Sequence, residues 1–564
     1  MSGQLIKNLT YICASMGMKQ AVIAPGSRNT PLILAFTRQP EIKCYPVTDE
    51  RSAAFFVLGM AQYSGNPVAL VCTSGTAVLN FAPAVAEAYY QHLPLIVITA
   101  DRPTAWIDQA DGQTIRQQHI FGNYVKASFQ LPTDVITTNT WQSDRTVSQA
   151  LDMALQFPRG PVHLNVPLDD PLYEALPAQH AFPRVIRTLG TVVQPDADTV
   201  DFFLKSWNNA GKRMILVGIG KHDKALGSLL ETLARETETL VVAENLSNVS
   251  GEHIIATPDL FFGALSAEEK QTLQPDMLIT IGHSLISKQL KQYLRRYQPK
   301  VQWQLQSEMP YADTYQSLGF VVPVKATRLL GVLADDPDFN ELASGKGDNE
   351  QSYRKLIREI QQHVKSRSEA YLSNLPFSDL AVFNELMPMI PEDWVLQIAN
   401  STPVRISQLF LSRPGLQYFA NRGTSGIEGS VSAAAGSATV SGKQTLLITG
   451  DLSFLYDSNG LWNCNFPDNL KILLLNNGGA NIFRIIGDQE ITKDAQEFFD
   501  ASHQVDIKSL VSAYGIKYSR CDQVVELKSM LTRFMQEKGA SVLEVVTEMD
   551  INMQTYKELF KYIR

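Results

Sequence analysis

The sequence has few cysteines and no long apolar run. Only five of its 564 residues are cysteines, and none of them stands in a Cys-x-x-Cys pair. This pattern argues against a disulfide framework and against a zinc site, and it favours reduced thiols in the cytoplasm. No apolar stretch approaches the roughly 20 residues that a membrane helix needs, and the first 20 residues lack a signal-peptide pattern. We therefore expect a cytoplasmic protein that does not span a membrane.

Positive charge is also scarce. The formal net charge is −8, which argues against a general nucleic-acid-binding protein. With 45% hydrophobic and 19% charged residues, the composition is that of an ordinary globular protein and not of a disordered one. The chain contains no low-complexity tract and no convincing sequence repeat. Any anionic substrate would therefore need arginines placed locally at its site.

The length exceeds what one hydrophobic core supports, and it predicts several domains. Short apolar runs alternate with helix-like segments, as in a parallel sheet that is covered by helices on both faces. The predicted fold is α/β, with three doubly wound domains at 1–180, 181–350 and 351–564. A linker is expected where Pro171, Pro177, Pro183 and Pro195 occur without clear periodicity.

Two strand ends in the last third carry the most informative polar residues. The apolar run 445–449 leads into Gly450-Asp451, and the run 472–475 leads into Asn476-Asn477-Gly478-Gly479. One βαβ crossover would bring Asp451 and Asn477 to neighbouring strand ends. Ligands bind at that edge of an α/β sheet, and Mg²⁺ takes one or two protein oxygens together with phosphate oxygens. The pattern predicts a magnesium-diphosphate site, although two ordinary strand-to-helix turns are the alternative, because Gly-Asp and Asn-Gly pairs are common in turns.

The arrangement G-D-x-S-F followed by N-N-G-G resembles the signature of the thiamine-diphosphate enzymes. Five further segments resemble the menaquinone-pathway branch of that family: APGSRNTPL (24–32), TDERSAAFFVLGMA (48–61), TSGTAVLNFAPAVAEA (73–88), ITADRP (98–103) and NRGTSGIEG (421–429). The resemblance therefore covers essentially the whole chain. The resemblance implies a pyrimidine-binding domain, a central domain and a diphosphate-binding domain. It also implies a transferase that uses thiamine diphosphate and Mg²⁺, with Mn²⁺ as a possible substitute.

The same resemblance assigns the cofactor residues. Glu50 would activate the cofactor by sharing a proton with its aminopyrimidine ring, and burial at the start of an apolar helix would raise its pKa. Asp451, the Asn477 side chain and the Gly479 carbonyl would hold the metal. Ile427 would keep the cofactor bent, while Ser401 and Ser453 would line its pocket. Taken singly, Glu50 could be an ordinary helix-start carboxylate, Ile427 could be core, and Ser401 could be a helix cap.

The implied substrates are 2-oxoglutarate and isochorismate, both of which are dicarboxylates. Such substrates call for arginines that bind carboxylates in a bidentate manner. The candidates are Ser27, Arg28, Arg102, Gln113, Lys288, Arg405, Arg422 and Phe483, and of these we expect the four arginines and Gln113 to act in catalysis together with Glu50. Each arginine alone could be a solvated surface residue, and Phe483 alone could be core. Gln289 departs from the arginine that the family carries beside Lys288, which leaves one carboxylate contact open.

The resemblance also implies an oligomer, because the family builds each site from the first domain of one chain and the third domain of another. A homodimer is then the minimum, and a tetramer is expected. Two rivals remain open. One is a thiamine-diphosphate enzyme that acts on monocarboxylates, either an acetohydroxyacid synthase or a 2-oxoacid decarboxylase, and the other is a catalytically silent protein of the same fold. Gly218-x-Gly220 lacks the full dinucleotide fingerprint and predicts a tight turn.

Overall fold

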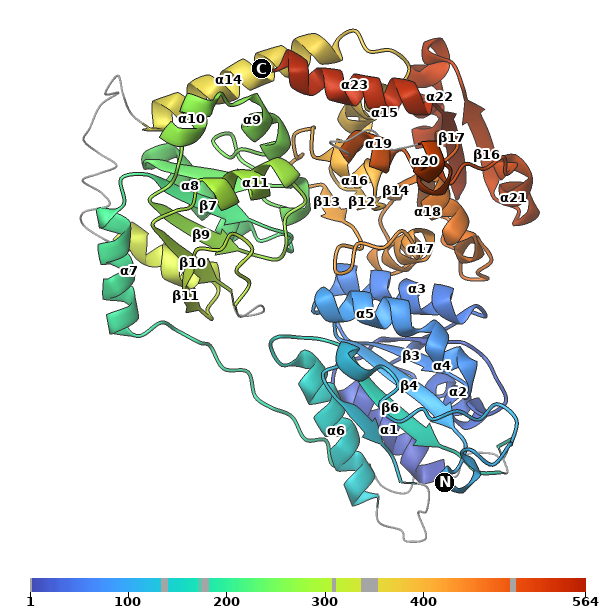
Figure 1. Ribbon diagram of the computed structural model, residues 1–564. Coiled ribbons are helices and arrows are strands. Elements are labelled where there is room, and N and C mark those ends of the chain that lie inside the picture. The colour runs from blue at the N-terminus through green and yellow to red at the C-terminus, as the bar shows by residue number, and fades with distance from the viewer. Residues whose placement is uncertain are drawn as a thin grey trace.

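Three parallel sheets, each in its own part of the chain, organise the molecule (Figure 1). The computed structural model describes residues 3–132, 140–170, 172–173, 182–306, 311–335, 353–486 and 493–564. Every strand pairing within the three sheets is parallel; the pairings of the first sheet, for example, join β1 to β2 and to β3. The predicted α/β class with three doubly wound sheets is therefore confirmed.

The first sheet has the order β2-β1-β3-β4-β6-β5. Its strands are β1 (Gln20–Ile23), β2 (Lys43–Pro46), β3 (Val68–Cys72), β4 (Leu95–Asp101), β5 (Ser128–Gln130) and β6 (Val162–Pro167). The helices around it are α1 (Gly3–Ser15), α2 (Thr30–Thr37), α3 (Glu50–Ser64), α4 (Thr76–Asn80), α5 (Ala82–Tyr90) and α6 (Trp141–Leu155). The strands β3, β4 and β6 are buried along their whole length, which explains why they read as continuous apolar runs.

The central sheet has the order β11-β10-β9-β7-β8. Its strands are β7 (Arg213–Val217), β8 (Thr239–Ala243), β9 (Met277–Ile281), β10 (Val301–Leu305) and β11 (Leu318–Val322). The helices of this part are α7 (Ala197–Asn209), α8 (Lys224–Glu236), α9 (Pro258–Ala264), α10 (Ala267–Thr272), α11 (Lys288–Arg296) and α12 (Ala326–Leu330). Gly218 lies at the end of β7, where an added Cβ would stand 1.8 Å from the His283 carbonyl oxygen. The backbone of the neighbouring loop therefore fills the space beside this glycine.

The third sheet, β13-β12-β14-β15-β17-β16, repeats the strand order of the first sheet. Its strands are β12 (Val395–Ile398), β13 (Gln417–Phe419), β14 (Thr445–Gly450), β15 (Leu470–Asn476), β16 (Lys517–Cys521) and β17 (Ser541–Val546). The helices of this part are α14 (Tyr353–Leu372), α15 (Asp379–Leu386), α16 (Thr402–Ser407), α17 (Ser430–Ser441), α18 (Asp451–Tyr456), α19 (Ile482–Ile486), α20 (Lys493–Asp500), α21 (Ile507–Ala513), α22 (Val524–Gln536) and α23 (Met549–Tyr562). The two outer parts thus share one topology although their sequences show no convincing repeat.

The first and third parts meet through α3 and α17, which lie against each other in Figure 1. Glycines permit this close packing on both sides. A Cβ on Gly59 would lie 1.8 Å from the Ala433 carbonyl oxygen, and one on Gly436 would lie 1.9 Å from the Phe56 carbonyl oxygen. Because real Cβ atoms never come this close to backbone, any larger residue at Gly59 or Gly436 would push the two helices apart.

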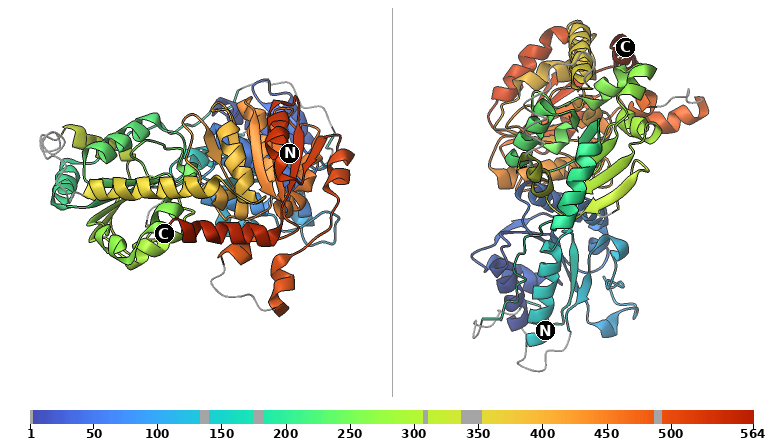
Figure 2. Two further views of the ribbon diagram at one scale, coloured as in Figure 1. Left: turned by 90° about the horizontal axis from the view of Figure 1, so that it is seen from above. Right: turned by 90° about the vertical axis from the view of Figure 1, so that its left-hand side faces the viewer.

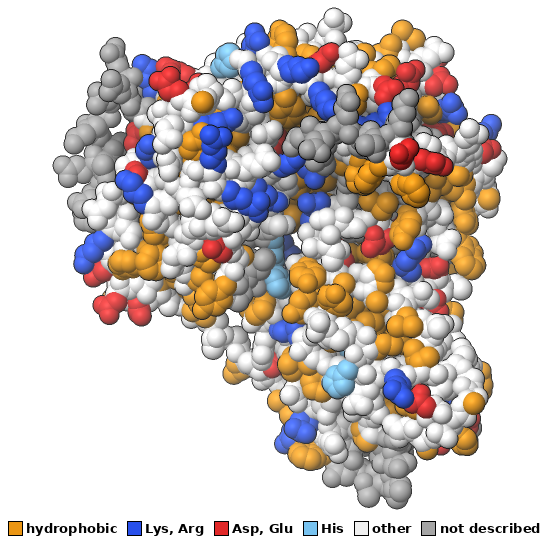
Figure 3. All heavy atoms as spheres, viewed as in Figure 1, with side chains coloured by type: hydrophobic (Ala, Val, Ile, Leu, Met, Phe, Trp, Pro, Cys, Tyr) orange, Lys and Arg blue, Asp and Glu red, His pale blue; other side chains and the backbone are white. Residues whose placement is uncertain are grey.

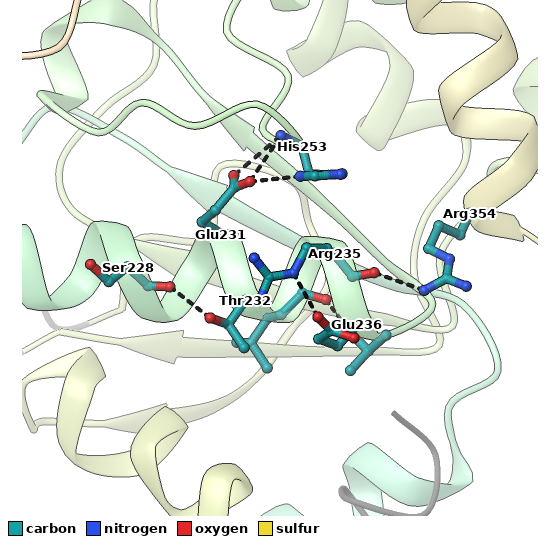
Figure 4. Close-up of polar contacts among 9 residues, drawn as sticks. Ser228, Glu231, Thr232, Arg235, Glu236, His253 and Arg354 are labelled. Atoms are coloured by element: carbon teal, nitrogen blue, oxygen red, sulfur yellow. Dashed lines mark hydrogen bonds and ion pairs between the residues drawn. The ribbon is translucent and has the colours of Figure 1, made fainter. Parts of the chain in front are cut away.

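Two long helices connect the central and third parts. Helices α14 and α23 run side by side in the left view of Figure 2, and Arg367 of α14 donates to the Tyr562 carbonyl oxygen at 2.9 Å. At its other end α14 is fixed to α8, since Arg354 Nη1 donates to the Arg235 carbonyl oxygen at 2.7 Å (Figure 4). Glu231 of α8 accepts from the His253 ring nitrogen Nδ1 at 2.6 Å, and this contact holds the loop after β8 against α8.

Several predictions about the chain organisation can be compared with this architecture. Residues 182–196, which include Pro183 and Pro195, contain neither helix nor strand and connect the first part to α7 (Figure 1). Pro171 and Pro177 lie outside the described residues, and the predicted domain boundaries at 180 and 350 do so as well. Among the helices that the structure describes, none is both long and apolar enough to cross a membrane. All five cysteines are free.

Candidate cofactor and substrate site

A cavity of about 270 Å³ opens at the carboxyl edge of the third sheet. It lies beyond the ends of β12, β14 and β15, and β14 pairs directly with β15. The predicted crossover is therefore present, with α18 following β14 and β15 returning beside it. The structure brings together on its wall the predicted residues Ser401, Ile427, Asp451, Ser453, Asn477, Gly479 and Phe483.

Asp451 and Asn477 face this cavity from the two adjacent strand ends. Asp451 is 2% exposed, and burial raises the pKa of its carboxyl group. Its Oδ1 accepts from Leu452 N at 2.7 Å, and its Oδ2 accepts from Gly479 N at 2.9 Å. Asn477 Oδ1 is buried and has no hydrogen-bond partner. A buried amide oxygen without a partner is costly, so this atom is suited to a ligand that supplies positive charge or a donor.

The donor set fits a magnesium ion that is shared with phosphate oxygens. The described residues contain no group of three or more His, Cys, Asp and Glu side chains placed to hold a metal. Mg²⁺ does not require one, because it is held by one or two carboxylates while phosphates and water complete its octahedron. Gly479 also fits, since a Cβ there would lie 2.2 Å from the Asp500 carbonyl oxygen, so that only glycine allows the backbone to take this path.

Ile427, Ser401 and Ser453 line the same cavity as the candidate metal residues. Ile427 is partly exposed and lines the cavity, so it is not an ordinary core residue. Ser453 donates to the Ile427 carbonyl oxygen at 2.6 Å and thereby fixes its backbone. Ser401 makes no side-chain capping bond to α16, and its backbone φ of 75° is in the left-handed region. Such strain in a non-glycine residue is typical of a functional site.

Phenylalanine rings stand at the mouth of the cavity. Phe483 is 44% exposed, which is not the packing of a core side chain, and its ring lies 4.9 Å from that of Phe499. Phe498 also lines the cavity and is 84% exposed. Large exposed rings that border a cavity mark a surface which contacts another molecule.

The loop after β13 carries Arg422 and Ile427, and it is held from two sides. Asn400, two residues after β12, donates to the carbonyl oxygens of Asn421 and Gly426, and its Oδ1 accepts from Arg422 Nη1 at 3.1 Å. From the first part of the chain, the buried Glu87 accepts from the backbone N–H groups of Gly423 and Thr424, both at 2.6 Å. These contacts fix the position of Arg422 beside the cavity.

Arg405 and Arg422 belong to a group of charges between the central and third parts. Burial lowers the pKa of Arg422, and the nearby Arg405 lowers it further. Burial also lowers the pKa of Lys291, and both arginines add to that decrease. The balancing carboxylate is Glu244, which accepts from the backbone N–H groups of Ile286 and Ser287 and whose pKa is raised by burial to about 7. Lysine and arginine side chains gather over this boundary on the face shown in Figure 3.

Lys288 is the first residue of α11, in the same region as this charged group. Gln289 donates through its backbone N–H to Asp259 Oδ1 at 3.4 Å. Lys291 stands one helical turn after Lys288, so it lies on the same side of α11. Lys288, Arg405 and Arg422 do not line the cavity of the third sheet.

The substrate candidates of the first part follow the ends of β1 and β4. Arg28 is 6% exposed, donates to the Leu168 carbonyl oxygen at 3.0 Å, and has a pKa lowered by burial and by Arg102. Arg102 pairs with Asp111 at 3.2 Å. Ser27 and Gln113 are exposed, and Gln113 has a φ of 53°. These four residues share one sheet edge but do not line the cavity of the third part.

Glu50 begins α3, and its surroundings differ from the expected buried setting. It is only partly buried in the single chain, and Asn80 donates to its Oε2 at 3.3 Å. The neighbouring Asp49 caps α3 and accepts from Asn459 at 2.9 Å, while Arg51 donates to the Tyr456 carbonyl oxygen at 2.7 Å. The start of α3 is thus fixed against the third part, but Glu50 is not on the cavity wall.

Sequence reasoning missed several residues of the site. Asn400 could have been found by its position shortly after a strand, and Glu87 as a lone carboxylate in the apolar segment APAVAEAYY. Asp379 reads as an ordinary acidic residue in a first helical turn, yet it lines the cavity. His503, whose Nε2 lies 3.3 Å from Asp451 Oδ2, has no local signal at all.

Two family models match this chain at the parts just described. The thiamine pyrophosphate enzyme N-terminal TPP binding domain matches residues 5–123, and the corresponding C-terminal TPP binding domain matches residues 401–545. The second range contains most of the cavity wall, and the first contains Glu50 and the first-part arginines. The fold, the cavity and these matches define a thiamine-diphosphate-dependent enzyme.

Relatives that are similar over their full length give a narrower family. The chain is 39% identical over 557 residues to the 2-succinyl-5-enolpyruvyl-6-hydroxy-3-cyclohexene-1-carboxylate synthase of Flavobacterium psychrophilum, covering 99% of this chain and 98% of that one. It is 37% identical to the synthases of the same name from Porphyromonas gingivalis, covering 97% and 95%, and from Desulfotalea psychrophila, covering 97% and 98%. The chain belongs to the family of 2-succinyl-5-enolpyruvyl-6-hydroxy-3-cyclohexene-1-carboxylate synthases.

Proposed function

We propose that this enzyme decarboxylates 2-oxoglutarate and adds the remaining succinyl-semialdehyde unit to isochorismate in a Stetter-type 1,4-addition. The products are CO₂ and 2-succinyl-5-enolpyruvyl-6-hydroxy-3-cyclohexene-1-carboxylate, and the reaction belongs to menaquinone (vitamin K2) biosynthesis in the cytoplasm. The names of the relatives support this proposal. The observation that carries it is the cavity that buried Asp451, Asn477 with its unpartnered Oδ1, and Ile427 line together.

Bound thiamine diphosphate supplies the electron sink for decarboxylation and for transfer of the acyl unit. Asp451, Asn477 Oδ1 and the Gly479 carbonyl oxygen would hold the Mg²⁺, or Mn²⁺ in its place, and Ser401 and Ser453 would line the cofactor pocket. Ile427, whose carbonyl oxygen accepts from Ser453, would pack against the cofactor. Glu50 would hold the proton that the aminopyrimidine ring requires.

Cationic side chains orient the two dicarboxylic acids. Arg405, Arg422 and Lys288 act from the third and central parts, and Phe483 packs against bound substrate. The buried setting that lowers the pKa of Arg422 strengthens its attraction for a carboxylate, because water screens it less. From the first part, Arg28, Arg102, Gln113 and Ser27 bind the other end of the substrates and stabilise the enolate charge that develops during addition.

We further propose that a homodimer is the minimum active unit and that dimers pair into a tetramer. Glu50 and the first-part arginines do not reach the cavity within one chain. The exposed Phe498 ring at the cavity mouth is suited to contact with a second chain. The first domain of the partner would then supply Glu50, and the third domain of this chain would supply the cofactor cavity.

The test is CO₂ release from 2-oxoglutarate in the presence of thiamine diphosphate and Mg²⁺, with and without isochorismate, with mass detection of the product. We expect stoichiometric product that requires both substrates. Faster turnover of pyruvate than of 2-oxoglutarate, with no dependence on isochorismate, would refute the substrate assignment and would leave the cofactor assignment standing. Absence of Mg²⁺-dependent cofactor binding would refute both.

A further inference from the structure

Asp379 is a buried carboxylate that the proposed mechanism does not use. It is the first residue of α15 and is 1% exposed, and it lines the same cavity as Asp451 and Asn477. The helix does not need it as a cap, because Ser378 already accepts from the Ala381 N–H group.

A closed ring of hydrogen bonds fixes Asp379. Thr547 Oγ1 donates to Asp379 Oδ1 at 2.7 Å, Asn552 Nδ2 donates to Thr547 Oγ1 at 2.9 Å, and the Asp379 backbone N–H donates to Asn552 Oδ1 at 2.7 Å. Thr547 in turn donates through its backbone N–H to the Asn476 carbonyl oxygen at 3.0 Å. The ring is thereby attached to the strand end that precedes Asn477.

The other oxygen of this carboxylate is left bare. Asp379 Oδ2 is buried and has no hydrogen-bond partner, and the same is true of Asn477 Oδ1. Asp379 and Asn477 line the same cavity. Burial raises the pKa of the Asp379 carboxyl group to about 6, and hydrogen bonding from Thr547 and from the Asn477 side chain acts in the opposite direction. A carboxylate with only a structural role has no reason to keep one buried oxygen bare, since such an atom costs free energy.

We propose that Asp379 is a positioning residue of the cation site, which holds the Asn477 amide so that its Oδ1 faces the metal. This inference rests on the function proposed above. An asparagine amide can flip, and the flipped form would turn its NH₂ group toward a cation. An ionised carboxylate only accepts hydrogen bonds, so Asp379 attracts the NH₂ group and repels Oδ1, which selects the orientation that a metal requires. Partners of metal ligands commonly act in this way.

Asp379→Asn tests the inference, because it keeps the shape and removes the selection. The new amide can donate to Asn477 Oδ1 and stabilise the flipped form. We expect Mg²⁺ to bind 10- to 100-fold more weakly, in the range seen when such partners are changed. Mg²⁺ is titrated by calorimetry into protein that is saturated with thiamine diphosphate. The KM for 2-oxoglutarate at saturating Mg²⁺ should change less than threefold, a split that a general structural defect would not produce.

Two further variants keep the test decisive. Glu385→Gln removes a carboxylate from the same helix that does not line the cavity, and it should leave Mg²⁺ binding unchanged. Thr547→Val removes the hydroxyl that fixes Asp379 Oδ1, and it should weaken Mg²⁺ binding several-fold even if Asp379→Asn fails to fold. Wild-type Mg²⁺ affinity in folded Asp379→Asn, or in folded Thr547→Val if the first variant does not fold, overturns the inference. Failure of the wild-type protein to bind thiamine diphosphate with Mg²⁺ overturns the proposed function instead.

Discussion

Replacement of Glu87 by alanine tests how the loop that carries Arg422 and Ile427 is held. Glu87 is 1% exposed on α5, and its carboxylate accepts three hydrogen bonds of 2.6 Å from that loop: two from the N–H groups of Gly423 and Thr424, and one from the Thr424 hydroxyl. Gln91 also donates to it. Because Glu87 belongs to the first part of the chain and the loop to the third, these bonds join the two.

The cost of this change can be worked out from the donors that lose their acceptor. A buried N–H group left without a partner costs roughly 1–3 kcal/mol. Thr424 is exposed and Gly423 is half-buried, so water can reach both groups and the lower end of that range applies. The sum is about 2–3 kcal/mol. If cofactor binding has to order the loop again, the affinity for thiamine diphosphate falls by a factor of roughly 30 to 150, since about 1.4 kcal/mol corresponds to tenfold.

Two measurements check the expectation. Chemical denaturation followed by tryptophan fluorescence should show an earlier transition in Glu87→Ala, and titration with thiamine diphosphate at saturating Mg²⁺ should show the weaker binding. Glu41→Ala is the matched control, because Glu41 forms an exposed ion pair with Lys19 at 3.4 Å, which contributes less than about 1 kcal/mol. A Glu87→Ala protein that resembles this control in both assays would refute the reasoning.

Three other changes test separate parts of the site and fold. Glu50→Gln should retain cofactor binding while turnover falls by orders of magnitude, and near-normal turnover would remove Glu50 from its role. Arg422→Ala should lower kcat/KM by about 10- to 100-fold, the worth of a charged hydrogen bond, with unchanged cofactor affinity; unaltered steady-state kinetics would contradict this. Asp457 is fully buried between Ser432, Arg51 and Asp49, and burial raises its pKa to about 7. Because the folded protein holds this proton more tightly than the unfolded chain, Asp457 contributes to the free energy of unfolding at low pH. That contribution decreases by at most about 4 kcal/mol as the pH rises from about 4 to 7. The thermal midpoint of Asp457→Asn should therefore depend less on pH over that range than that of the wild-type protein, and parallel profiles would exclude the assignment.

The sequence predicts most of this fold because its strands are buried on both faces. Apolar runs such as Leu470–Asn476 cannot be mistaken for amphipathic helices, and strand β15 lies where this run is. Strands at the edge of a sheet are harder to predict in this way, because they are shorter or less apolar. Strand β16 (Lys517–Cys521) is half-exposed and polar, and β5 (Ser128–Gln130) has three residues, so neither gives a clear signal.

The residues of the candidate site also differ in how well the sequence predicts them. Asp451 and Asn477 were predictable because sequence position alone carries them to adjacent strand ends. Asp379 and Glu87 were not predictable, since their importance comes from contacts with residues more than a hundred positions away, such as Thr547 and Thr424. Glu50 lies between these cases: its place at the start of α3 was predicted, whereas in the single chain it is only partly buried.

The repeated topology gives a physical reason for a two-chain site. Helices α3 and α17 occupy equivalent places after β2 and β13, and they pack on each other through Gly59 and Gly436 in matching contacts. The first and third parts therefore meet through helices that hold equivalent places in the two sheets. Within one chain, the first-part edge that carries Arg28 and Arg102 does not line the cavity beside Asp451. A second copy that brings its first part against the third part of this chain would join one edge of each kind, and it would do so twice by symmetry. The proposed dimer thus predicts a partner chain at the cavity mouth.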